Sequence, residues 1–438
     1  MNSFRLRELF LLFRYPSILL PAALLACCAL AGGCTEKNHA DDKQLLRFYT
    51  WKPNQPEVWD EIIRMFEAEH PGVKVRREIG PHSSTAFHDL LSQKLKNRSP
   101  DLDVFLMDVV WPAEFAAAGW ASALNKRFSK AEQDLYLPNT IEANTYNGKI
   151  YGVPIFIDSG ILYYRKDLLD QYGFEPPKTW AEMASQARTI TAKEPDLYGF
   201  SAQFKQYEGL VCNMLEYITS NQGSLVNRES GKPTVADPPA VAAVRFVRDR
   251  IIGETAPIGV LTYEEPESLA LFIQGKAVFH RNWPYAWEAA NNPERSRVAG
   301  KVGIAQLPHF PGGKSHAALG GWQAGISAYS ENKDLAWIFV RYLTSSRIQK
   351  HLALKASLAP TRTMLYEDAE ILRACPQFRD MKPIFLSAVA RPVSPLYPSL
   401  SNIMQRFFSK AISDSSTDIA REARIATSEM KKTLALVP

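Results

Sequence analysis

Apolar residues along the chain recur at two spacings, one typical of strands and the other of helices. Residues 45–49 form a short, mostly apolar run that predicts a strand. A helix is predicted next, because Val58, Ile62, Ile63 and Phe66 recur at helical spacing. His70-Pro71-Gly72 ends this helix, and residues 73–75 predict a second strand.

The same alternation continues further along the chain. Residues 104–107 predict a strand that ends at Asp108. Thr179-Trp180-Ala181-Glu182 predicts a helix start, because Thr179 can accept from a first-turn amide while Glu182 reaches back. Strands that alternate with amphipathic helices indicate an α/β fold. No internal repeat or long low-complexity linker interrupts the pattern, so we expect domains joined by short crossings.

The N-terminal segment has the pattern of an export signal. Arg5, Arg7 and Arg14 form a basic region, and residues 17–30 form an apolar run broken only by Pro21. This run is shorter than the roughly 20 apolar residues that a membrane span needs. Small residues then precede Cys34, which resembles a bacterial lipobox, although the leucine lies one position further from the cysteine than is usual.

We therefore expect residues 1–33 to be a lipoprotein signal peptide, and Cys34 to carry the lipid that anchors the exported protein to a bacterial membrane on its periplasmic side. A less usual lipobox precedes Cys27. The other alternative is an ordinary signal peptide cut near Ala40, which would release a soluble periplasmic protein.

Length and charge limit the classes of protein that remain. A chain beginning at Cys34 keeps 405 of the 438 residues, enough for two domains of ordinary size. Its formal charge is +3, because the leader carries three of the 51 basic residues and one of the 46 acidic ones. No basic stripe or block of like charge occurs, so we expect no nucleic-acid partner. Beyond Cys34 only Cys212 and Cys375 remain, and they could either pair or stay as buried thiols.

Catalytic motifs are missing from the sequence. It contains no phosphate-binding loop, no G-x-S-x-G, no H-E-x-x-H and, beyond Cys34, no C-x-x-C. We therefore expect a protein that is not an enzyme and that needs no cofactor or metal.

Aromatic residues beside small residues and single polar groups are the most distinctive local pattern. Trp111 follows Asp108, residues 281–287 place three aromatics in one turn, and Gly320-Gly321-Trp322-Gln323 places a tryptophan after two glycines. Aromatic faces stack on the C–H faces of sugar rings, while carboxylates and guanidinium groups pair with hydroxyls. The pattern is therefore typical of a carbohydrate cleft, although a single tryptophan is more often a core residue.

Four segments resemble the type 1 extracellular solute-binding proteins of ABC importers, the group that contains maltose- and trehalose/maltose-binding proteins. They are residues 100–108 with 111–120, 152–158 with 162–169, 304–308 with 320–326, and 359–362. The first is similar to a strand that ends in a ligand-facing acid, and the other three are similar to the crossings between two lobes.

The resemblance implies an α/β fold of two lobes, the maltose-binding-protein-like type II periplasmic binding protein fold, closing on ligand about a hinge. We expect lobe one to contain residues 35–156 and 322–358, and lobe two residues 157–321 and 359–438. The function implied is capture of a sugar such as trehalose, maltose or a related glucoside, and its delivery to the permease subunits of an ABC importer. We expect the protein to act as a monomer.

The resemblance also implies the ligand-binding residues. Trp283, Trp322 and Tyr285 would stack on the sugar, Asp108 and Asp158 would accept from its hydroxyls, and Arg362 would donate to it; Gln55 and Thr85 lie in early loops that face the cleft in relatives. The indole of Trp322 is expected to be partly exposed before sugar arrives. Each aromatic could instead be a core residue, each acid a cap or turn residue, and Arg362 a surface ion-pair partner.

Two other kinds of function compete with this interpretation. A glycosidase would need two carboxylates flanking the scissile bond, and Asp108 with Asp158 could form such a pair. A protein of the same fold could also bind a different solute, such as an organophosphate, a polyamine or a metal. A phosphate ligand would call for clustered basic groups, which the sequence does not show.

Overall fold

The computed structural model describes residues 43–227 and 229–436, which belong to one compact unit, 43–438. The signal peptide, Cys34 and the alternative processing sites at Cys27 and Ala40 lie outside the described residues.

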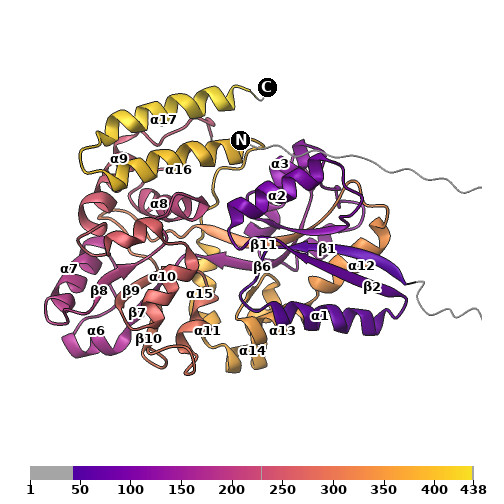
Figure 1. Cartoon of the computed structure of the whole chain (residues 1–438), viewed down its shortest axis with the longest axis horizontal. Coiled ribbons are helices and arrows are strands. Elements are labelled where there is room, and N and C mark those ends of the chain that lie inside the picture. The colour runs from indigo at the N-terminus through magenta and orange to yellow at the C-terminus, as the bar shows by residue number, and fades with distance from the viewer. Residues whose placement is uncertain (1–42, 228, 437–438) are drawn as a thin grey trace, which may run out of the picture. The chain divides into compact units, whose positions relative to one another are not determined.

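A six-stranded mixed sheet organises the first lobe (Figure 1). Its order is β12-β6-β11-β3-β1-β2, with β1 parallel to β2 and β3, and β11 antiparallel to β3 and β6. The strands predicted at residues 45–49, 73–75 and 104–107 are confirmed as members of this sheet. The bounds are β1 Gln44–Thr50, β2 Val73–Ile79, β3 Val104–Asp108, β6 Val153–Ser159, β11 Leu319–Ile326 and β12 Ala359–Pro360.

Helices cover both faces of this sheet, with α2 and α3 above it and α1 and α13 below it in Figure 1. The predicted helix at residues 58–66 is confirmed within α1, whose buried residues face the core and whose end is capped by His70. A short hairpin, β4 Thr145–Tyr146 and β5 Lys149–Ile150, stands apart from the sheet. The helices are α1 Pro56–Glu69, α2 Ser84–Lys96, α3 Pro112–Ala117, α4 Lys130–Gln133, α5 Pro138–Ala143, α12 Lys333–Leu343 and α13 Ser346–Ala356.

A four-stranded sheet organises the second lobe, in the order β10-β7-β9-β8. The capping box predicted at Thr179 and Glu182 is confirmed at the start of α7, with both of its hydrogen bonds present. The strands are β7 Ile161–Arg165, β8 Tyr198–Ser201, β9 Ala277–Asn282 and β10 Val302–Ala305. The helices around them are α6 Lys166–Tyr172, α7 Trp180–Thr191, α8 Glu208–Ser220, α9 Pro238–Phe246, η1 Val247–Ile251, η2 Ile258–Thr262, α10 Glu265–Ile273 and α11 Ala286–Asn291.

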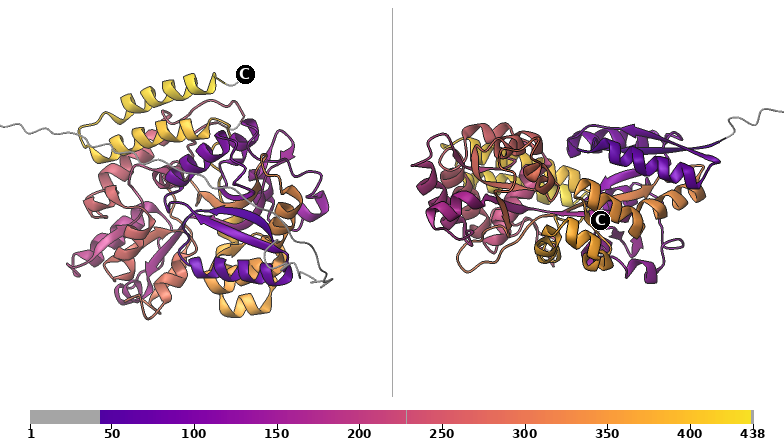
Figure 2. Two further views of the ribbon diagram at one scale, coloured as in Figure 1. Left: turned by 45° about the vertical axis from the view of Figure 1, so that its right-hand side comes forward. Right: turned by 90° about the horizontal axis from the view of Figure 1, so that it is seen from below.

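The C-terminal part of the chain adds helices to this second group. In Figure 1, α16 and α17 lie side by side over α8 and α9, and both helices contact α9. Figure 2 shows the same elements from two further directions. The bounds are η3 Thr363–Glu367, α14 Ala369–Ala374, α15 Gln377–Leu386, α16 Tyr397–Ser413 and α17 Ile419–Leu434.

The strands β6 and β7 belong to different sheets, and only Gly160 separates them. A Cβ atom at Gly160 would lie 2.0 Å from Glu216 Oε1, so a glycine is required there. Glu216 accepts from Arg281 Nε at 2.9 Å and from the Ala318 amide at 3.0 Å, and it thereby ties α8 to β9 and to the segment leading into β11. The α/β, two-lobed fold predicted from the sequence is thus observed, with a very short crossing between the sheets.

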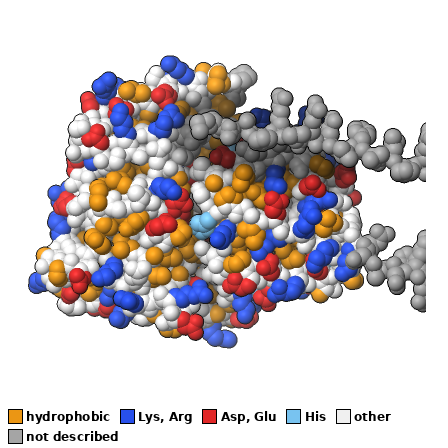
Figure 3. All heavy atoms as spheres, viewed as in Figure 1, with side chains coloured by type: hydrophobic (Ala, Val, Ile, Leu, Met, Phe, Trp, Pro, Cys, Tyr) orange, Lys and Arg blue, Asp and Glu red, His pale blue; other side chains and the backbone are white. Residues whose placement is uncertain are grey.

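The buried residues form two hydrophobic cores, one around each sheet, and Ile157, Leu319 and Ala359 of the six-stranded sheet belong to the core of the second lobe. Cys212 and Cys375 are both buried and unpaired, which decides between the two states that the sequence allowed. Lys, Arg, Asp and Glu side chains are interspersed over the face shown in Figure 3. Among the described residues, no helix has the length and the apolar character needed to cross a bilayer.

Candidate ligand-binding pocket

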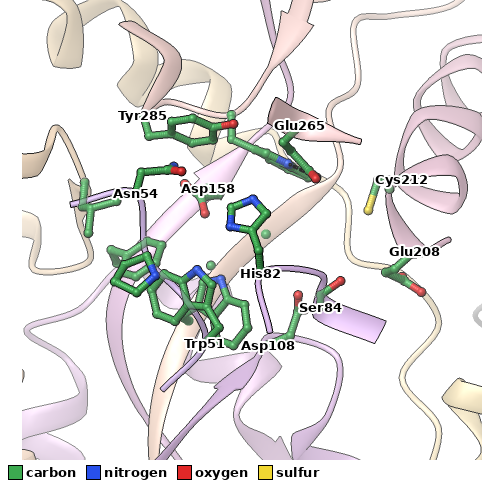
Figure 4. Close-up of a pocket in the computed structure, with 18 of the residues that line it drawn as sticks. Trp51, Asn54, His82, Ser84, Asp108, Asp158, Glu208, Cys212, Glu265 and Tyr285 are labelled. Carbon is green, nitrogen blue, oxygen red and sulfur yellow. Dashed lines mark hydrogen bonds between the residues drawn. The ribbon is translucent and has the colours of Figure 1, made fainter. Parts of the chain in front are cut away.

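Residues from both lobes line one pocket (Figure 4). The aromatic residues come from α1, from the position after β1, from β6, from β11 and from the segment after β9, while carboxylates come from β3, β6, α8 and α10. The ends of strands and the starts of helices therefore meet at the pocket, as expected for a ligand site in an α/β protein. Its lining residues include Trp51, Asn54, Gln55, His82, Ser84, Asp108, Phe156, Asp158, Glu208, Cys212, Glu265, Trp283, Tyr285, Gly320, Gly321, Trp322 and Arg391.

Most of the residues expected at the ligand site come together in this pocket. Six of the eight line it: Gln55, Asp108, Asp158, Trp283, Tyr285 and Trp322. The Nε2 atom of Gln55 is 3.5 Å from Glu288 Oε2 of α11. This contact joins the two lobes, because Gln55 precedes α1 of the first lobe and Glu288 lies in α11 of the second.

The structure does not bring Thr85 or Arg362 into the pocket. Thr85 lies in the first turn of α2 and lines a neighbouring crevice, whereas the adjacent Ser84 lines both spaces. Arg362 donates to the Thr344 carbonyl at 2.8 Å and to the Tyr136 hydroxyl at 2.9 Å, and its guanidinium lies 4.6 Å from the centre of the Tyr136 ring. Its side-chain hydrogen bonds thus go to two residues of the first lobe, Thr344 and Tyr136, neither of which lines the pocket.

Trp322 is more buried than expected. Its side chain is only 8 % exposed, and its ring stacks on Trp51 with 4.4 Å between centroids and 12° between planes. Trp111 contacts it edge-on and Phe87 packs beside it. The expectation of a partly exposed Trp322 indole is therefore wrong, because Trp51, which is half-buried, covers one of its faces.

Asp108 is held by a buried arginine that the sequence did not indicate. Arg391, which is 3 % exposed, donates from Nη2 to Asp108 Oδ1 at 3.0 Å and from Nη1 to Glu208 Oε1 at 2.6 Å. Glu208 also accepts from the hydroxyls of Tyr397 and Ser401. Burial raises the pKa of Asp108, while the charge of Arg391 opposes this increase. One guanidinium thus connects a strand end of the first lobe to a helix start of the second.

Asp158 differs from Asp108 because it has no such partner. Its Oδ1 atom is shielded from solvent and accepts no hydrogen bond from the described residues. Burial, followed by the charge of Asp108, raises the pKa of Asp158 to about 7, although Arg281 favours the ionised form. The carboxyl group can therefore either accept or donate a hydrogen bond near neutral pH.

The opposite wall of the pocket is fixed by contacts around Trp283. Its indole Nε1 donates to Glu265 Oε1 at 3.1 Å, and the Tyr163 hydroxyl donates to its carbonyl at 2.8 Å. The guanidinium of Arg281 lies 4.0 Å from the centre of its ring. Burial and hydrogen bonding therefore hold this indole in one orientation beside Gly320, whose missing Cβ would lie 3.1 Å from the ring.

Several lining residues were not found from the sequence, namely Trp51, His82, Glu208, Glu265 and Arg391. Trp51 follows β1 at its carboxyl end, so the rule that ligands bind at strand ends could have indicated it. Glu208 and Glu265 are the first residues of helices, where an acid is common for stability alone. Arg391 lies in an irregular segment between α15 and α16 and has no local signal.

No cluster of three or more His, Cys, Asp or Glu that could hold a metal ion occurs among the residues that the structure describes. The polar groups of the pocket instead combine carboxylate acceptors with aromatic faces. Such a combination can bind an organic ligand that carries hydroxyl or amino groups.

Comparison with known proteins identifies the family. Residues 49–350 match the family described as bacterial extracellular solute-binding protein. A "Probable ABC transporter-binding protein" of Deinococcus radiodurans is 42% identical over 350 residues, which cover 79% of this chain and 82% of that protein.

Solved structures agree with this assignment. Maltose-bound T. maritima MalE3 is 37% identical, with a TM-score of 0.84, and the match covers 89% of this chain and 99% of that one. The GacH receptor of Streptomyces glaucescens, solved without ligand and with acarbose, is 26% identical with a TM-score of 0.80, over 90% and 99% of the two chains. The chain therefore belongs to the bacterial extracellular solute-binding protein family.

Proposed function

We propose that the protein is the substrate-binding component of an ABC importer and captures a sugar, such as maltose, trehalose or a related glucoside, in the pocket between its lobes. The observation that carries this proposal is the composition of the pocket. Indoles from both lobes, Trp51 and Trp283, share it with the carboxylate of Asp158, whose Oδ1 atom has no hydrogen-bond partner among the residues that the structure describes. Aromatic faces and free carboxylate oxygens are the groups that bind pyranose rings and their hydroxyls.

Relatives support the same function. The similar MalE3 structure is described with maltose bound, and the Deinococcus relative carries the name of an ABC transporter-binding protein. In the proposed cycle the permease subunits receive the sugar, the protein acts as a monomer without turnover, and no cofactor takes part.

The proposed ligand contacts follow from the geometry. Trp51, Trp283 and Tyr285 would supply stacking faces, while Trp322 supports Trp51 from behind. Asp158 and the second oxygen of Asp108 would accept from sugar hydroxyls, and Gln55 would close the mouth through Glu288. We leave Thr85 and Arg362 out of this set because neither lines the pocket.

We also propose that the two lobes move about three crossings. At each crossing, the buried residues on the two sides belong to different hydrophobic cores. The boundary between the cores falls between Phe156 and Ile157, between Leu319 and Trp322, and between Leu358 and Ala359. These positions support the expected division into residues 35–156 with 322–358 and residues 157–321 with 359–438. Closure would then bring Asp158 and Trp283 towards Trp51.

Export and lipid anchoring at Cys34 complete the proposal. The basic, apolar and small-residue order of residues 5–33 supports it. A Cys34→Ser variant is expected to leave the membrane fraction, because the lipid chains at Cys34 would be its only attachment. If the Cys34→Ser variant still sediments with membranes, the anchor is assigned wrongly.

A thermal-shift screen of saccharides tests the binding function. A ligand at a thousandfold excess over its Kd raises the free energy of unfolding by about 4 kcal/mol, so a true ligand should give a clear increase in Tm. Maltose, trehalose and longer glucosides are expected to include at least one such ligand. No shift with any saccharide would contradict the proposal.

A further inference from the structure

We infer that the preferred ligand is a sugar that carries a protonated amino group, bound with its ammonium between Asp158 and Glu265; this inference rests on the proposed sugar-binding function. Both side chains line the pocket that holds the aromatic walls, and Figure 4 shows them on the same side of it as Tyr285.

The two arginines near the pocket are already engaged in ion pairs. Arg391 is paired with Asp108 and Glu208, and Arg281 is paired with Glu216. In the described part of the chain, neither Asp158 nor Glu265 takes part in an ion pair. Two carboxylates of the pocket are therefore left without a cation.

The hydrogen bonds at these two carboxylates leave room for a donor. Glu265 accepts a hydrogen bond from Trp283 Nε1 at 3.1 Å, and the Tyr207 hydroxyl lies beside it. Asp158 Oδ1 is shielded from solvent and has no partner among the described residues. A buried carboxylate without donors is costly, and an ammonium group would supply three.

The two carboxylates are also close enough to affect each other. The charge of Glu265 disfavours ionisation of Asp158, as does that of Asp108, while Arg281 is the neighbouring group that favours it. A neutral sugar would cover the carboxylates of Asp158 and Glu265 without supplying a positive charge to either of them. A cation between them removes the repulsion and forms charge-assisted hydrogen bonds, which are roughly twice as strong as neutral ones.

The walls of the pocket favour a ring over a flexible amine. Trp51, Trp283 and Tyr285 offer aromatic surface to a ligand, and such surface attracts both C–H groups and cations. A linear polyamine would satisfy the carboxylates but leave this surface with little to contact. An amino sugar uses both features.

Binding should release a proton. Because Asp158 has a pKa of about 7, part of the ligand-free protein carries a proton on this carboxyl at neutral pH. An arriving ammonium would displace that proton to solvent, since it favours the carboxylate. A neutral sugar would give no such release.

Calorimetric titration of the mature protein with matched pairs of sugars tests the inference. The pairs are D-glucose with D-glucosamine, cellobiose with fully deacetylated chitobiose, and trehalose with 6-amino-6-deoxytrehalose. In at least one pair the amine is expected to bind roughly tenfold tighter than its neutral partner. Titrations at pH 7 in buffers of different ionisation enthalpy should show proton release with that amine and none with the neutral sugar.

Substitutions separate this inference from a general effect of charge. Asp158→Asn and Glu265→Gln should each remove most of the preference for the amine. Glu294→Gln, an exposed carboxylate of the same lobe, should keep it. If one pocket variant fails to fold, the other variant and the proton release in the unmodified protein still show whether an ammonium group binds between the two carboxylates.

Each outcome of these titrations is informative. Neutral sugars that bind as tightly as their amines in every pair overturn this inference and support the proposed function. Spermidine is titrated as the linear-amine comparison. If spermidine binds while no sugar of these pairs or of the thermal-shift screen does, both this inference and the proposed function are overturned, and both are also overturned if no compound of either set binds.

Discussion

The indole rings of Trp51 and Trp322 stack face to face, 4.4 Å apart at an angle of 12°, although the two residues are far apart in the sequence. Trp322 is buried behind this contact and Trp51 is half-buried in front of it. Both tryptophans line the pocket, and we infer that Trp51 offers its surface to the ligand while Trp322 mainly supports Trp51.

Substitution of each tryptophan should separate these functions. Trp51→Ala is expected to weaken sugar binding by about 1.5–3 kcal/mol, because stacking area is lost. Trp322→Ala is expected to lower the free energy of unfolding by about 3–5 kcal/mol, because it leaves a cavity. Calorimetric titration and denaturant unfolding of both variants measure the two effects.

Trp337→Ala is the matched control for Trp51, since Trp337 is also half-buried in the first lobe but does not line the pocket. It should leave sugar affinity unchanged. Equal loss of affinity in the Trp51 and Trp337 variants would mean that Trp51 acts only through the fold.

Asp158→Asn should stabilise the protein in a pH-dependent way. The pKa of Asp158 is about 7 in the folded protein against an ordinary 3.8, so the folded state binds the proton more tightly than the unfolded state. The contribution of Asp158 to stability is therefore lost as the pH rises from about 4 to 7. The advantage of the asparagine variant should grow over this range, to at most about 4 kcal/mol, and stay constant above pH 8.

Unfolding by denaturant at pH 4, 5, 6, 7 and 8 gives this dependence. A difference between the two proteins that is the same at every pH would contradict the assignment of the titrating group.

Arg391→Met should destabilise the protein much more than Arg362→Met. Removing Arg391 leaves Asp108 and Glu208 buried without their cation, which costs about 3–5 kcal/mol near neutral pH. The loss should become smaller in acid, where Asp108, whose pKa is raised by burial, can be protonated. Unfolding curves at pH 7 and pH 4 measure it.

The same pair of variants tests which arginine belongs to the site. Arg362→Met should leave sugar affinity within about twofold, because Arg362 donates to Thr344 and Tyr136 away from the pocket. A large loss of affinity in this variant, with stability preserved, would return Arg362 to the ligand site.

The sequence predicted the fold better than it predicted the site. The strands before Asp108 and the helix after Thr179 carry local signals, namely apolar spacing and a capping box, and both were found. Asp158 and Trp283 were expected at the ligand site through resemblance to a family rather than through spacing, and both line the pocket. Arg391 was missed because nothing in its local sequence distinguishes it from Arg362, and only the tertiary fold decides which arginine meets Asp108.

The burial of the Trp322 side chain could not be predicted from the sequence either. Trp322 follows two glycines, which suggested an open approach to ligand. Gly321 instead allows the chain to adopt φ = +126°, with a Cβ that would lie 2.5 Å from the Phe156 carbonyl oxygen. The glycines thus let β11 lie close against β6, which places the indole inside the lobe.

Gly321→Ala should therefore be strongly destabilising. The added methyl would meet backbone atoms of β6 and require a φ that alanine rarely adopts, so we expect a loss of several kcal/mol. Gly72→Ala, where a Cβ meets no atom within 4 Å, is the control and should change stability by less than about 1 kcal/mol. Thermal unfolding of both variants measures the difference, and equal stability would refute this account of the crossing.

Calorimetric titration of the purified mature protein with maltose and with trehalose, followed by chromatography of the recovered sugar, is the most direct test of the proposed function. Since the pocket combines aromatic walls with carboxylate acceptors and the sequence carries no catalytic motif, at least one sugar should bind with one-to-one stoichiometry and be recovered intact. Release of free glucose, or the absence of binding to either sugar and to every saccharide of the thermal-shift screen, would contradict it.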